Sequence, residues 1–499
     1  MSNIAIKNLS FRYEDSSKNI FNDLNLNLDS SWKLGLVGRN GRGKTTFLNL
    51  LRRKIHGTGT IEPKLNFSYF PIKIENPDNI TLYELQKQID FEEWQLRREL
   101  NLMGVNADLI WQPFNTLSGG EQTKVLLALT FADQDSFSLI DEPTNHLDKK
   151  SRQEIVKYLN QQKSGYILIS HDREFLNKVT NHILAIENTE IHLYQGNYAA
   201  YEDTKAKRDG FNKAKNEKLR SEIISLKKSA QRIRQYSEKS EKQKDYRTHT
   251  NEPMGMFDRG YLGHKAAKIM KKSKNMERHL SQKIDKKEGL LINIESSPEL
   301  KMNFIPNYHS NLLDIRDLTL SIGKRRLFAD LNLVVKNHGI VALEGQNGSG
   351  KSTLLRLLLG DAEEIEKSGR IVLTNGLKIS YLSQTFSQYY GTLMEFSKKE
   401  KLDYTLLLNT LNKMGMPRTT FSTPIEEMSV GQQKRVAIAK SLVEPTDLYL
   451  WDEPANYLDV FNQNQLIKLL KNVQPAMLLV EHDQYFIEQV ASKRISLNN

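Results

Sequence analysis

The chain has 499 residues, no cysteine and a formal net charge of +11. The length predicts about three or four domains, and the lack of cysteine excludes disulfides, thiolate catalysis and zinc fingers. No run of eighteen or more uncharged apolar residues occurs, and the N-terminal M-S-N-I-A-I-K leads directly into a strand-like alternation. These features predict a cytoplasmic protein that is neither secreted nor inserted in a membrane.

A phosphate-binding loop is the first motif in chain order. Residues 38–45 read G-R-N-G-R-G-K-T, between the apolar run L-G-L-V and the helix-like run F-L-N-L-L. This order of strand, glycine loop and helix lets backbone N–H groups and a helix N-terminus bind phosphates. Lys44 is expected on the β- and γ-phosphates of ATP, and Thr45 on Mg²⁺. The residues expected at the nucleotide are Gly38, Asn40, Gly41, Gly43, Lys44, Thr45 and Thr46.

Three further motifs follow in the first half of the chain. They are L-S-G-G-E-Q from Leu117, the apolar strand F-S-L-I-D-E that ends at Glu142, and S-H-D, which contains His171. A carboxylate at the end of a buried strand can hold the Mg²⁺ shell, which is the role expected of Asp141. Glu142 would polarise the attacking water, and His171 would lie near the γ-phosphate. A single D-E or a single His is more often a surface cluster or a core residue, but four motifs in this order argue against that interpretation.

A basic segment follows the first set of motifs. Residues 201–290 hold 25 Lys and Arg against 13 Asp and Glu, so this segment accounts for the whole charge excess. A localised basic surface indicates a polyanionic partner, although a solvated helical face is the simpler alternative. Apolar residues recur here at coiled-coil spacing, first in a helix expected from about Thr204 to Asp245 and then in a return segment. The predicted seam contains Leu219, Ile223, Leu226, Ala230, Ile233, Leu262, Ala266, Ile269, Met276, Leu280, Ile284 and Leu291.

The turn of this predicted antiparallel hairpin is expected at residues 248–261. Its sequence is T-N-E-P-M-G-M-F-D-R-G-Y from Thr250, in which Pro253, Gly255 and Gly260 are expected to break the helices. Apolar groups left in water usually mark a contact site, although a loop collapsed on its own helices is an alternative. The candidate contact residues at this tip are Met254, Met256 and Phe257.

The second half of the chain repeats the motifs of the first half. G-Q-N-G-S-G-K-S occupies residues 345–352, and M-S-V-G-Q-Q, L-Y-L-W-D-E and E-H-D follow. One phosphate loop arises by accident in roughly one or two of every hundred such chains, but four motif pairs in register indicate an internal duplication. Lys44 and Lys351 lie 307 residues apart, and Asp141 and Asp452 lie 311 apart. The corresponding nucleotide, metal and catalytic candidates are Gly345, Asn347, Gly348, Gly350, Lys351, Ser352, Thr353, Asp452, Glu453 and His482.

The S-G-G-E stretch makes both halves resemble the ATP-binding-cassette superfamily. The resemblance implies an α/β fold with two tandem ABC-type ATPase domains, at 1–200 and 301–499, joined by the helical hairpin at 201–300. It also implies that the serine and glycines of one cassette complete the ATP site of the other, so that a monomer holds both sites. One site would then combine the loop of Lys44 with Ser429, Gly431 and Gln432, and the other would combine the loop of Lys351 with Ser118, Gly119, Gly120 and Glu121.

The two halves depart from the superfamily pattern in different ways. The usual glutamine after the strand is Ile72 in the first half, whereas the second half keeps Gln384, which the resemblance places at ATP and Mg²⁺. Tyr13 can stack on adenine, but its counterpart is Ile322, and Val430 replaces a signature glycine. We therefore expect two unequal sites.

The arrangement of the whole chain resembles the ABC-F proteins, which are cytosolic ATPases that bind the ribosomal tRNA exit site. The segments R-N-G-R-G-K-T, W-K-L-G-L, F-D-R-G-Y-L-G-H-K-A-A-K and W-D-E-P-A-N-Y-L-D-V-F-N-Q are most similar to the Lsa type of antibiotic-resistance protein. This resemblance implies a 70S ribosome as partner (50S subunit, 23S rRNA and P-site tRNA) and protection against lincosamides, pleuromutilins and group A streptogramins. The residues expected to follow rRNA phosphates are Arg232, Arg234, Lys242, Lys244, Lys265, Lys268, Lys271, Lys272 and Lys274.

Three other functions are compatible with parts of this pattern. A housekeeping translation factor of the same fold is the nearest, because the sequence contains no readable pattern of drug contacts. An energising subunit of a transporter is disfavoured by the fused cassettes and by Ile72, which stands where transporters couple to their membrane subunits. A DNA-repair or chromosome ATPase is also disfavoured, because such proteins typically have zinc modules or far longer coiled coils than this sequence predicts.

Overall fold

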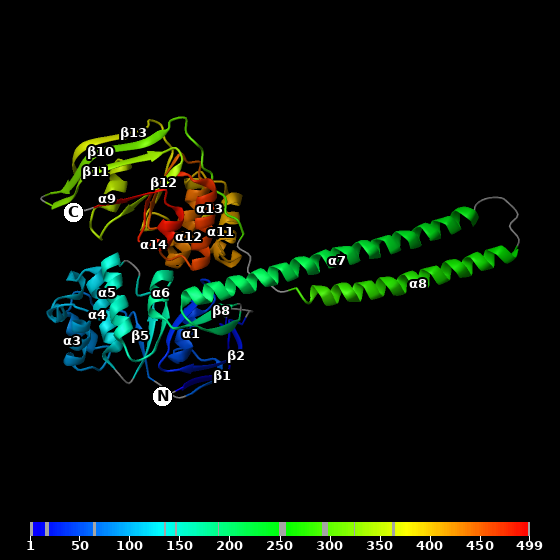
Figure 1. Cartoon of the computed structure of the whole chain (residues 1–499), viewed down its shortest axis with the longest axis horizontal. Coiled ribbons are helices and arrows are strands. Elements are labelled where there is room, and N and C mark those ends of the chain that lie inside the picture. The colour runs from blue at the N-terminus through cyan, green and yellow to red at the C-terminus, as the bar shows by residue number, and fades with distance from the viewer. Residues whose placement is uncertain are drawn as a thin grey trace. The chain divides into compact units, whose positions relative to one another are not determined.

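The computed structural model describes residues 3–14, 19–62, 66–133, 136–144, 147–187, 189–248, 256–291, 298–323, 325–361 and 365–497. The chain divides into two compact units, one formed by Met1–Tyr201 with Ser297–Asn499 and the other by Glu202–Ser296. The first unit contains two α/β cassettes, and the second contains two long helices (Figure 1). Within the described ranges, no helix is both long enough and apolar enough to cross a bilayer.

The first cassette combines a six-stranded and a three-stranded sheet. The larger sheet has the order β5-β6-β7-β3-β8-β9, parallel except for β9, and the antiparallel smaller sheet has the order β2-β1-β4. Its elements are β1 (Asn3–Phe11), β2 (Phe21–Asp29), β3 (Lys33–Gly38), α1 (Lys44–Leu51), β4 (Thr58–Glu62), β5 (Phe67–Phe70), α2 (Thr81–Gln86), α3 (Glu93–Leu102), η1 (Ala107–Trp111), η2 (Phe114–Thr116), α4 (Gly119–Ala132), β6 (Phe137–Asp141), α5 (Lys149–Gln161), β7 (Tyr166–Ile169), α6 (Arg173–Val179), β8 (His182–Glu187) and β9 (Glu190–Gln195).

The second cassette repeats this architecture. Its parallel sheet has the order β14-β15-β16-β12-β17, and its antiparallel sheet has the order β11-β10-β13. Its elements are β10 (Asn311–Ile322), β11 (Arg325–Lys336), β12 (Gly339–Glu344), α9 (Lys351–Leu358), β13 (Ile365–Leu373), β14 (Ile379–Leu382), α10 (Leu393–Lys399), α11 (Tyr404–Lys413), η3 (Arg418–Ser422), η4 (Ile425–Glu427), α12 (Val430–Val443), β15 (Leu448–Asp452), α13 (Val460–Val473), β16 (Ala476–Val480), α14 (Gln484–Val490) and β17 (Lys493–Ser496).

The central strands of each large sheet are buried on both faces, which explains their continuous apolar sequences. β15 and β16 read L-Y-L-W-D and A-M-L-L-V, and every residue of both strands is buried. Since these strands are parallel, their carboxyl ends meet at one edge of the sheet. Asp452 ends β15 and the E-H-D segment follows β16, so the topology alone brings these motifs together.

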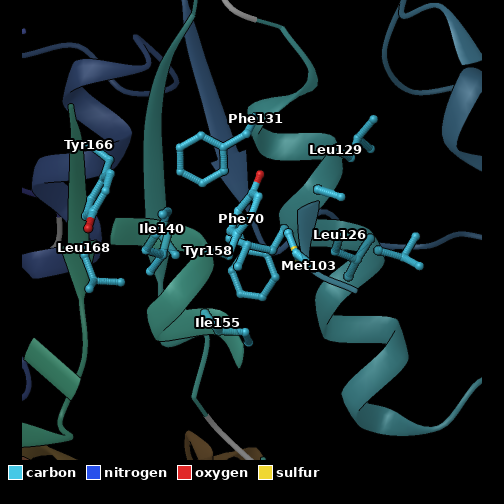
Figure 2. Packing of buried hydrophobic residues seen from close by; sticks show 14 of the residues in the cluster. Phe70, Met103, Leu126, Leu129, Phe131, Ile140, Ile155, Tyr158, Tyr166 and Leu168 are labelled. Atoms are coloured by element: carbon cyan, nitrogen blue, oxygen red, sulfur yellow. The ribbon is translucent and has the colours of Figure 1, made fainter. Parts of the chain in front are cut away.

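Aromatic side chains fill the core between α4, α5 and the large sheet of the first cassette (Figure 2). The ring of Phe131 meets those of Tyr158 and Tyr166 edge-on, with centroid distances of 5.6 and 6.1 Å. The buried hydroxyl groups are satisfied, because Tyr158 donates to Glu99 at 2.6 Å and Tyr166 donates to the carbonyl oxygen of Val179 at 2.5 Å. These rings therefore contribute apolar burial without leaving a polar group unpaired.

Two helices, α7 (Tyr198–Thr248) and α8 (Met256–Glu288), form the segment between the cassettes and run antiparallel in Figure 1. The 51 residues of α7 correspond to a length of about 75 Å. The helix begins six residues before the expected Thr204. Its early start has a local cause, because Asn197 Oδ1 accepts the backbone N–H of Ala200 and the rings of Tyr198 and Tyr201 are buried in the core of the first cassette.

The two helices contact each other through part of the expected seam. Leu219 and Ile223 are buried, and the ion pairs Lys227–Glu288 (2.8 Å) and Lys287–Glu222 (2.5 Å) join the helices nearby. Met276, which was expected in the seam, is 52% exposed, so the spacing was a poor guide at that position. The side chains of Leu262, Ala266 and Ile269 lie outside the described part of the structure.

The expected boundaries of the hairpin tip are wrong at the α8 side. α8 already begins at Met256, so Gly260 lies inside a helix and does not break it. A single glycine costs a helix only about 1 kcal/mol, which a helix of 33 residues can absorb. Phe257 accordingly occupies the first turn of α8, whereas Met254 and Gly255 fall outside the described residues.

Candidate functional site

The first phosphate loop depends on a left-handed glycine at its end. Gly43 has φ 93° immediately before α1, and a β-carbon there would lie 2.5 Å from Ile20 Cγ2. The loop then closes around Lys44, whose Nζ donates to the carbonyl oxygen of Gly38 at 2.8 Å and to Asn40 Oδ1 at 3.1 Å. The ammonium group is therefore buried inside the ring of the loop, where a bound phosphate would meet it.

The second phosphate loop has the same construction. Gly350 has φ 95°, and α9 begins at Lys351, whose Nζ donates to the carbonyl oxygens of Gly345 (2.9 Å) and Gln346 (2.8 Å). Gly41 and Gly348, in the middle of the two loops, also have positive φ values, of 80° and 76°. Asn347 stands beside Gly348 in its loop, and Thr353 is buried in the first turn of α9.

The adenine-side candidates differ between the cassettes. The hydroxyl of Tyr13 is 3.1 Å from Thr46 Oγ1, and its ring packs edge-on against Phe11 with centroids 4.9 Å apart. Tyr13 remains 45% exposed, so one side of the ring is open to a ligand. Its counterpart Ile322 is 39% exposed and offers no aromatic ring.

The proposed metal-binding oxygens lie next to the loops. Thr45 donates to Asp141 Oδ2 at 3.1 Å, and Gln384 Nε2 lies 3.5 Å from Asp452 Oδ1. Ser352 makes the corresponding hydrogen bond to Asp452, although burial still raises the pKa of that carboxyl group. Hydroxyl and carboxylate oxygens suit Mg²⁺, which takes its other ligands from phosphates and water. The donor set therefore fits ATP with Mg²⁺, and no cluster of three or more His, Asp or Glu among the described residues suggests a different metal.

The two candidate water-polarising glutamates adopt a backbone conformation that is rare for non-glycine residues. Glu142 has φ 53° and Glu453 has φ 48°, and each donates its N–H to the end of the adjacent strand, at Ile169 (2.9 Å) and Val480 (2.8 Å). Burial, and then the neighbouring aspartate, raises the pKa of Glu142 to about 8 and that of Glu453 to about 7. Strained, buried carboxylates of this kind are typical of catalytic sites.

A neutral histidine faces each glutamate. Nε2 of His171 is 3.3 Å from Glu142 Oε1, and Nε2 of His482 is 3.6 Å from Glu453 Oε1. Burial, and then the nearby loop lysine, lowers the pKa of His171 to about 3 and that of His482 to about 4. Both imidazoles are therefore uncharged at pH 7 and can donate or accept a hydrogen bond.

The second cassette contributes directly to the first phosphate loop. The backbone N–H of Asn40 donates to Asp459 Oδ2 at 2.7 Å, and Asn40 Nδ2 donates to the carbonyl oxygen of Tyr457 at 3.3 Å. Gly431 lies beside the hydrogen bond between Asn40 and Tyr457, because a β-carbon at Gly431 would be 3.3 Å from Tyr457 O and 3.8 Å from Asn40 Nδ2. The structure thus brings the Gly431 segment onto the loop of Lys44.

The serine of each signature segment caps a helix. Ser118 with Glu121, and Ser429 with Gln432, form capping boxes at the start of α4 and α12. A β-carbon at Gly120 would lie 3.3 Å from Ser151 Oγ, so the neighbour of this glycine belongs to the first cassette itself. The first-cassette residues whose charges act on the pKa of His482 are Arg152, which lowers it, and Asp148, which raises it, both at the start of α5.

Several residues at the contact between the cassettes were missed by sequence reasoning. The guanidinium carbon of Arg39 lies 3.8 Å from the ring centroid of Phe461, and Arg173 donates to Asn464 Oδ1 at 2.5 Å. Asp459 could have been found, because L-D recurs at Asp148 and Asp459 at the common offset of 311 residues. Arg173 could not, because its duplicate position is Gln484.

The candidate rRNA-binding residues lie on both helices of the hairpin. The side chains of Lys242, Lys244 and Lys265 are outside the described part, as are those of Met256 and Phe257. The remaining candidates share high exposure to solvent, and they are Arg232, Arg234, Lys268, Lys271, Lys272 and Lys274.

Comparisons with known proteins match both halves. The model of the family described as "ABC transporter" matches residues 21–145 and 328–456. The chain is 26% identical to the ribosome protection protein VmlR of Bacillus subtilis, over 99% of this chain and 87% of that protein. It is also 26% identical to the ATP-binding protein Uup of Caulobacter vibrioides, over 99% of this chain and 77% of that protein.

Solved structures support the fold. The archaeal ribosome recycling factor aABCE1, solved in complex with the ribosomal stalk protein aP1, matches with a TM-score of 0.61 and 19% identity, over 99% of this chain and 87% of that chain. The structure described as RNase-L Inhibitor also has a TM-score of 0.61, with 18% identity over 99% of this chain and 88% of that chain. At these identities, the likeness concerns the fold of paired cassettes.

The Asp459 contact can be tested by separating its two hydrogen bonds. Oδ1 of Asp459 caps α13 by accepting the N–H of Asn462, while Oδ2 accepts the N–H of Asn40. Asp459→Asn keeps a capping oxygen but presents an amide to Asn40, so ATP turnover should fall by about 10- to 100-fold, the equivalent of about 1.5–3 kcal/mol. Asp459→Ala should lose the same activity and, in addition, about 1 kcal/mol of stability in denaturant unfolding. Normal turnover in both variants would contradict a role for this contact.

Proposed function

Because the chain belongs to the ABC transporter family and is an ATPase, we propose that it is an ABC-F protein of the Lsa type that protects the ribosome from antibiotics. In this proposal the protein is a cytoplasmic monomer that binds the 70S ribosome. Its linker enters from the E site and acts at the peptidyl-transferase region of the 50S subunit, against lincosamides, pleuromutilins and group A streptogramins.

The geometry supports a defined division of roles at each ATP site. Lys44 and Lys351 bind the β- and γ-phosphates within their loops. Thr45 and Asp141 in one site, and Ser352, Gln384 and Asp452 in the other, would hold Mg²⁺, which would supply charge neutralisation at the phosphates.

Each hydrolytic step then depends on a glutamate and its facing histidine. Glu142 and Glu453 orient and polarise the attacking water, and their side chains lie against His171 and His482. The neutral His171 and His482 offer a hydrogen bond near the γ-phosphate. Because Asn40 and Gly431 meet at the first loop, closing the cassettes is part of building that site.

The observation that carries the ribosome proposal is the position of the charge. The cassettes are nearly neutral together, while the helical segment between them holds the basic excess on exposed side chains such as Lys268, Lys271 and Lys272. A long, basic and narrow element suits a groove lined by nucleic acid phosphates. The similarity to VmlR, named a ribosome protection protein, along nearly the full length of this chain also supports this assignment.

A housekeeping translation factor is the second candidate. The chain is equally identical, at 26%, to VmlR and to Uup, so identity does not separate a protection protein from other members with this architecture. The two functions differ in drug susceptibility, which is the measurement that decides between them.

Trapping on the ribosome tests the ATPase assignment. Replacing Glu142 and Glu453 together by Gln should lower ATP turnover by at least about 100-fold while ATP binding persists, because only the water-polarising groups change. The variant should then cosediment with ribosomes in the presence of ATP, whereas wild-type protein is released. Release like that of the wild type would contradict the roles given to the two glutamates.

Charge reversal tests how the hairpin binds. The variant Lys268→Glu/Lys271→Glu/Lys272→Glu should weaken ribosome binding and reduce the slope of log affinity against log salt by about two to three, because three phosphate contacts are lost. A control with the same net charge uses three exposed cassette lysines, Lys163→Glu/Lys367→Glu/Lys398→Glu, and should keep the wild-type slope. Equal slopes for both variants would show that the hairpin lysines are only solvated.

Drug susceptibility distinguishes resistance from housekeeping. Expression in a susceptible strain should raise resistance to lincomycin, a pleuromutilin and a group A streptogramin, and Phe257→Ala should abolish this effect while ribosome binding and ATPase persist. Phe211→Ala is the matched control, because Phe211 is a 71% exposed phenylalanine near the start of α7. If wild-type protein confers no resistance, the housekeeping assignment is favoured. Full resistance with Phe257→Ala would exclude this residue as the effector.

A further inference from the structure

Two duplicate positions near the catalytic glutamates differ in a correlated way. The second cassette has Lys434 and Glu481 where the first has Thr123 and Ser170, at the common offset of 311 residues. Lys434 and Glu481 are 1% and 2% exposed, so the second cassette buries two opposite charges that the first cassette lacks. Burying charges is costly, and they are tolerated only when their hydrogen-bond partners are well placed.

Lys434 reaches from α12 to the backbone of the catalytic turn. Its Nζ donates to the carbonyl oxygen of Glu453 at 2.8 Å and lies 3.5 Å from that of Asp452. The ring of Phe386 covers the ammonium group, with 5.6 Å between Nζ and the ring centroid. The hydrogen bond therefore acts at the left-handed residue Glu453, whose backbone conformation costs roughly 1–3 kcal/mol and has to be held by its surroundings.

Glu481 holds the other end of the same turn. Its Oε2 accepts the N–H of Ala455 at 2.9 Å, and its Oε1 accepts those of His482 (2.7 Å) and Asp483 (3.1 Å). Lys434 thus donates to the carbonyl oxygen at one end of the turn from Glu453 to Ala455, and Glu481 accepts the N–H at its other end. Glu481 also fixes the backbone of His482, which faces the carboxylate of Glu453.

In the first cassette a neutral hydroxyl pair contacts the equivalent turn, and the counterpart of Lys434 does not reach it. Thr123 donates to the carbonyl oxygen of Gly119 in its own helix, at 2.9 Å, and Ser170 Oγ lies 3.2 Å from Thr144 Oγ1. A pocket of about 460 Å³ opens beside Thr123, lined among others by Asp141 and Glu142. These three residues are the counterparts of Lys434, Asp452 and Glu453, so the first cassette is open where the second is occupied by the lysine.

We propose that Lys434 is a positioning residue for ATP hydrolysis at the second site, with Glu481 holding the other end of the same turn, and that the first site works without such a pair. Lys434 acts through the backbone of Glu453, to whose carbonyl oxygen its Nζ donates. The inference rests on the proposed role of Glu453 as the water-polarising group. It implies that hydrolysis at the second site depends on Lys434 of α12, whereas hydrolysis at the first site does not.

Single-turnover hydrolysis in a Glu142→Gln background isolates the second site. There, Lys434→Thr should lower the rate constant by about 10- to 100-fold, the penalty of a slightly misplaced catalytic group, while the ATP concentration for half-maximal rate changes by less than about threefold. Lys434→Thr/Glu481→Ser removes both groups that hold the turn, and Ala455 offers a serine at position 481 no hydroxyl partner like Thr144 in the first cassette, so this double variant should not recover the lost rate. In a Glu453→Gln background, Lys434→Thr should leave turnover at the first site within about twofold.

The outcomes separate this inference from the proposed function. Residual turnover in Glu142→Gln/Glu453→Gln equal to that of Glu142→Gln would overturn the role of Glu453 itself. If that double variant is inactive but Lys434→Thr keeps its full rate, the positioning role is wrong. If Lys434→Thr weakens ATP binding and lowers the melting temperature as well as the rate, or if Lys434→Thr/Glu481→Ser regains the full rate, Lys434 is not a positioning residue, which also overturns the proposal.

Discussion

A single hydrogen bond, from the backbone N–H of Asn40 to the carboxylate of Asp459, joins residues 419 positions apart in the chain. It ties the phosphate loop of one cassette to the start of a helix in the other. Because the same aspartate caps α13 through Asn462, the geometry of the first ATP site and the start of α13 cannot change independently.

The helices at this contact also hold the chain on both sides of the hairpin. In α13, the side chain of Gln465 donates to the carbonyl oxygens of Pro298 and Lys413, just where the chain enters the second cassette. In α6, Arg173 contacts Asn464 of the other cassette. One turn further along α6, Asn177 accepts the N–H of Ala199 at the start of α7. Ala199 and Pro298, which flank the helical unit in sequence, are therefore both bonded within the cassette unit.

The duplication has produced two sites that share a backbone plan and differ in their side chains. Both keep the left-handed glycine, the loop lysine, the left-handed glutamate and the neutral histidine, which are the groups that the proposed phosphate binding and water activation would require. They differ around these groups, with Gln384 at Asp452 where the first half has Ile72, and with buried charges only behind Glu453. The two sites therefore share the groups nearest the loop lysine and differ in the groups that support them.

The sequence by itself determined the motifs, their duplication and the elements that carry them. Strand, loop and helix at Lys44 and Lys351 were predictable, because the backbone of a phosphate loop follows from local glycine geometry and apolar runs. The meeting of Asp141, Glu142 and His171 at one sheet edge also followed from the order of parallel strands. Periodicity likewise indicated two long helices around a turn.

The tertiary structure decided what local patterns do not encode. Glycine is a weak helix breaker, so the start of α8 at Met256 depended on the rest of that helix and not on Gly260. Met276 has seam spacing yet is half exposed, because burial depends on where the partner helix passes. Arg173 and Lys434 have their partners in Asn464 of the other cassette and in a backbone carbonyl oxygen, and neither contact leaves a trace in residue spacing. Such contacts are set by how the cassettes and their layers pack, and only the folded chain contains that information.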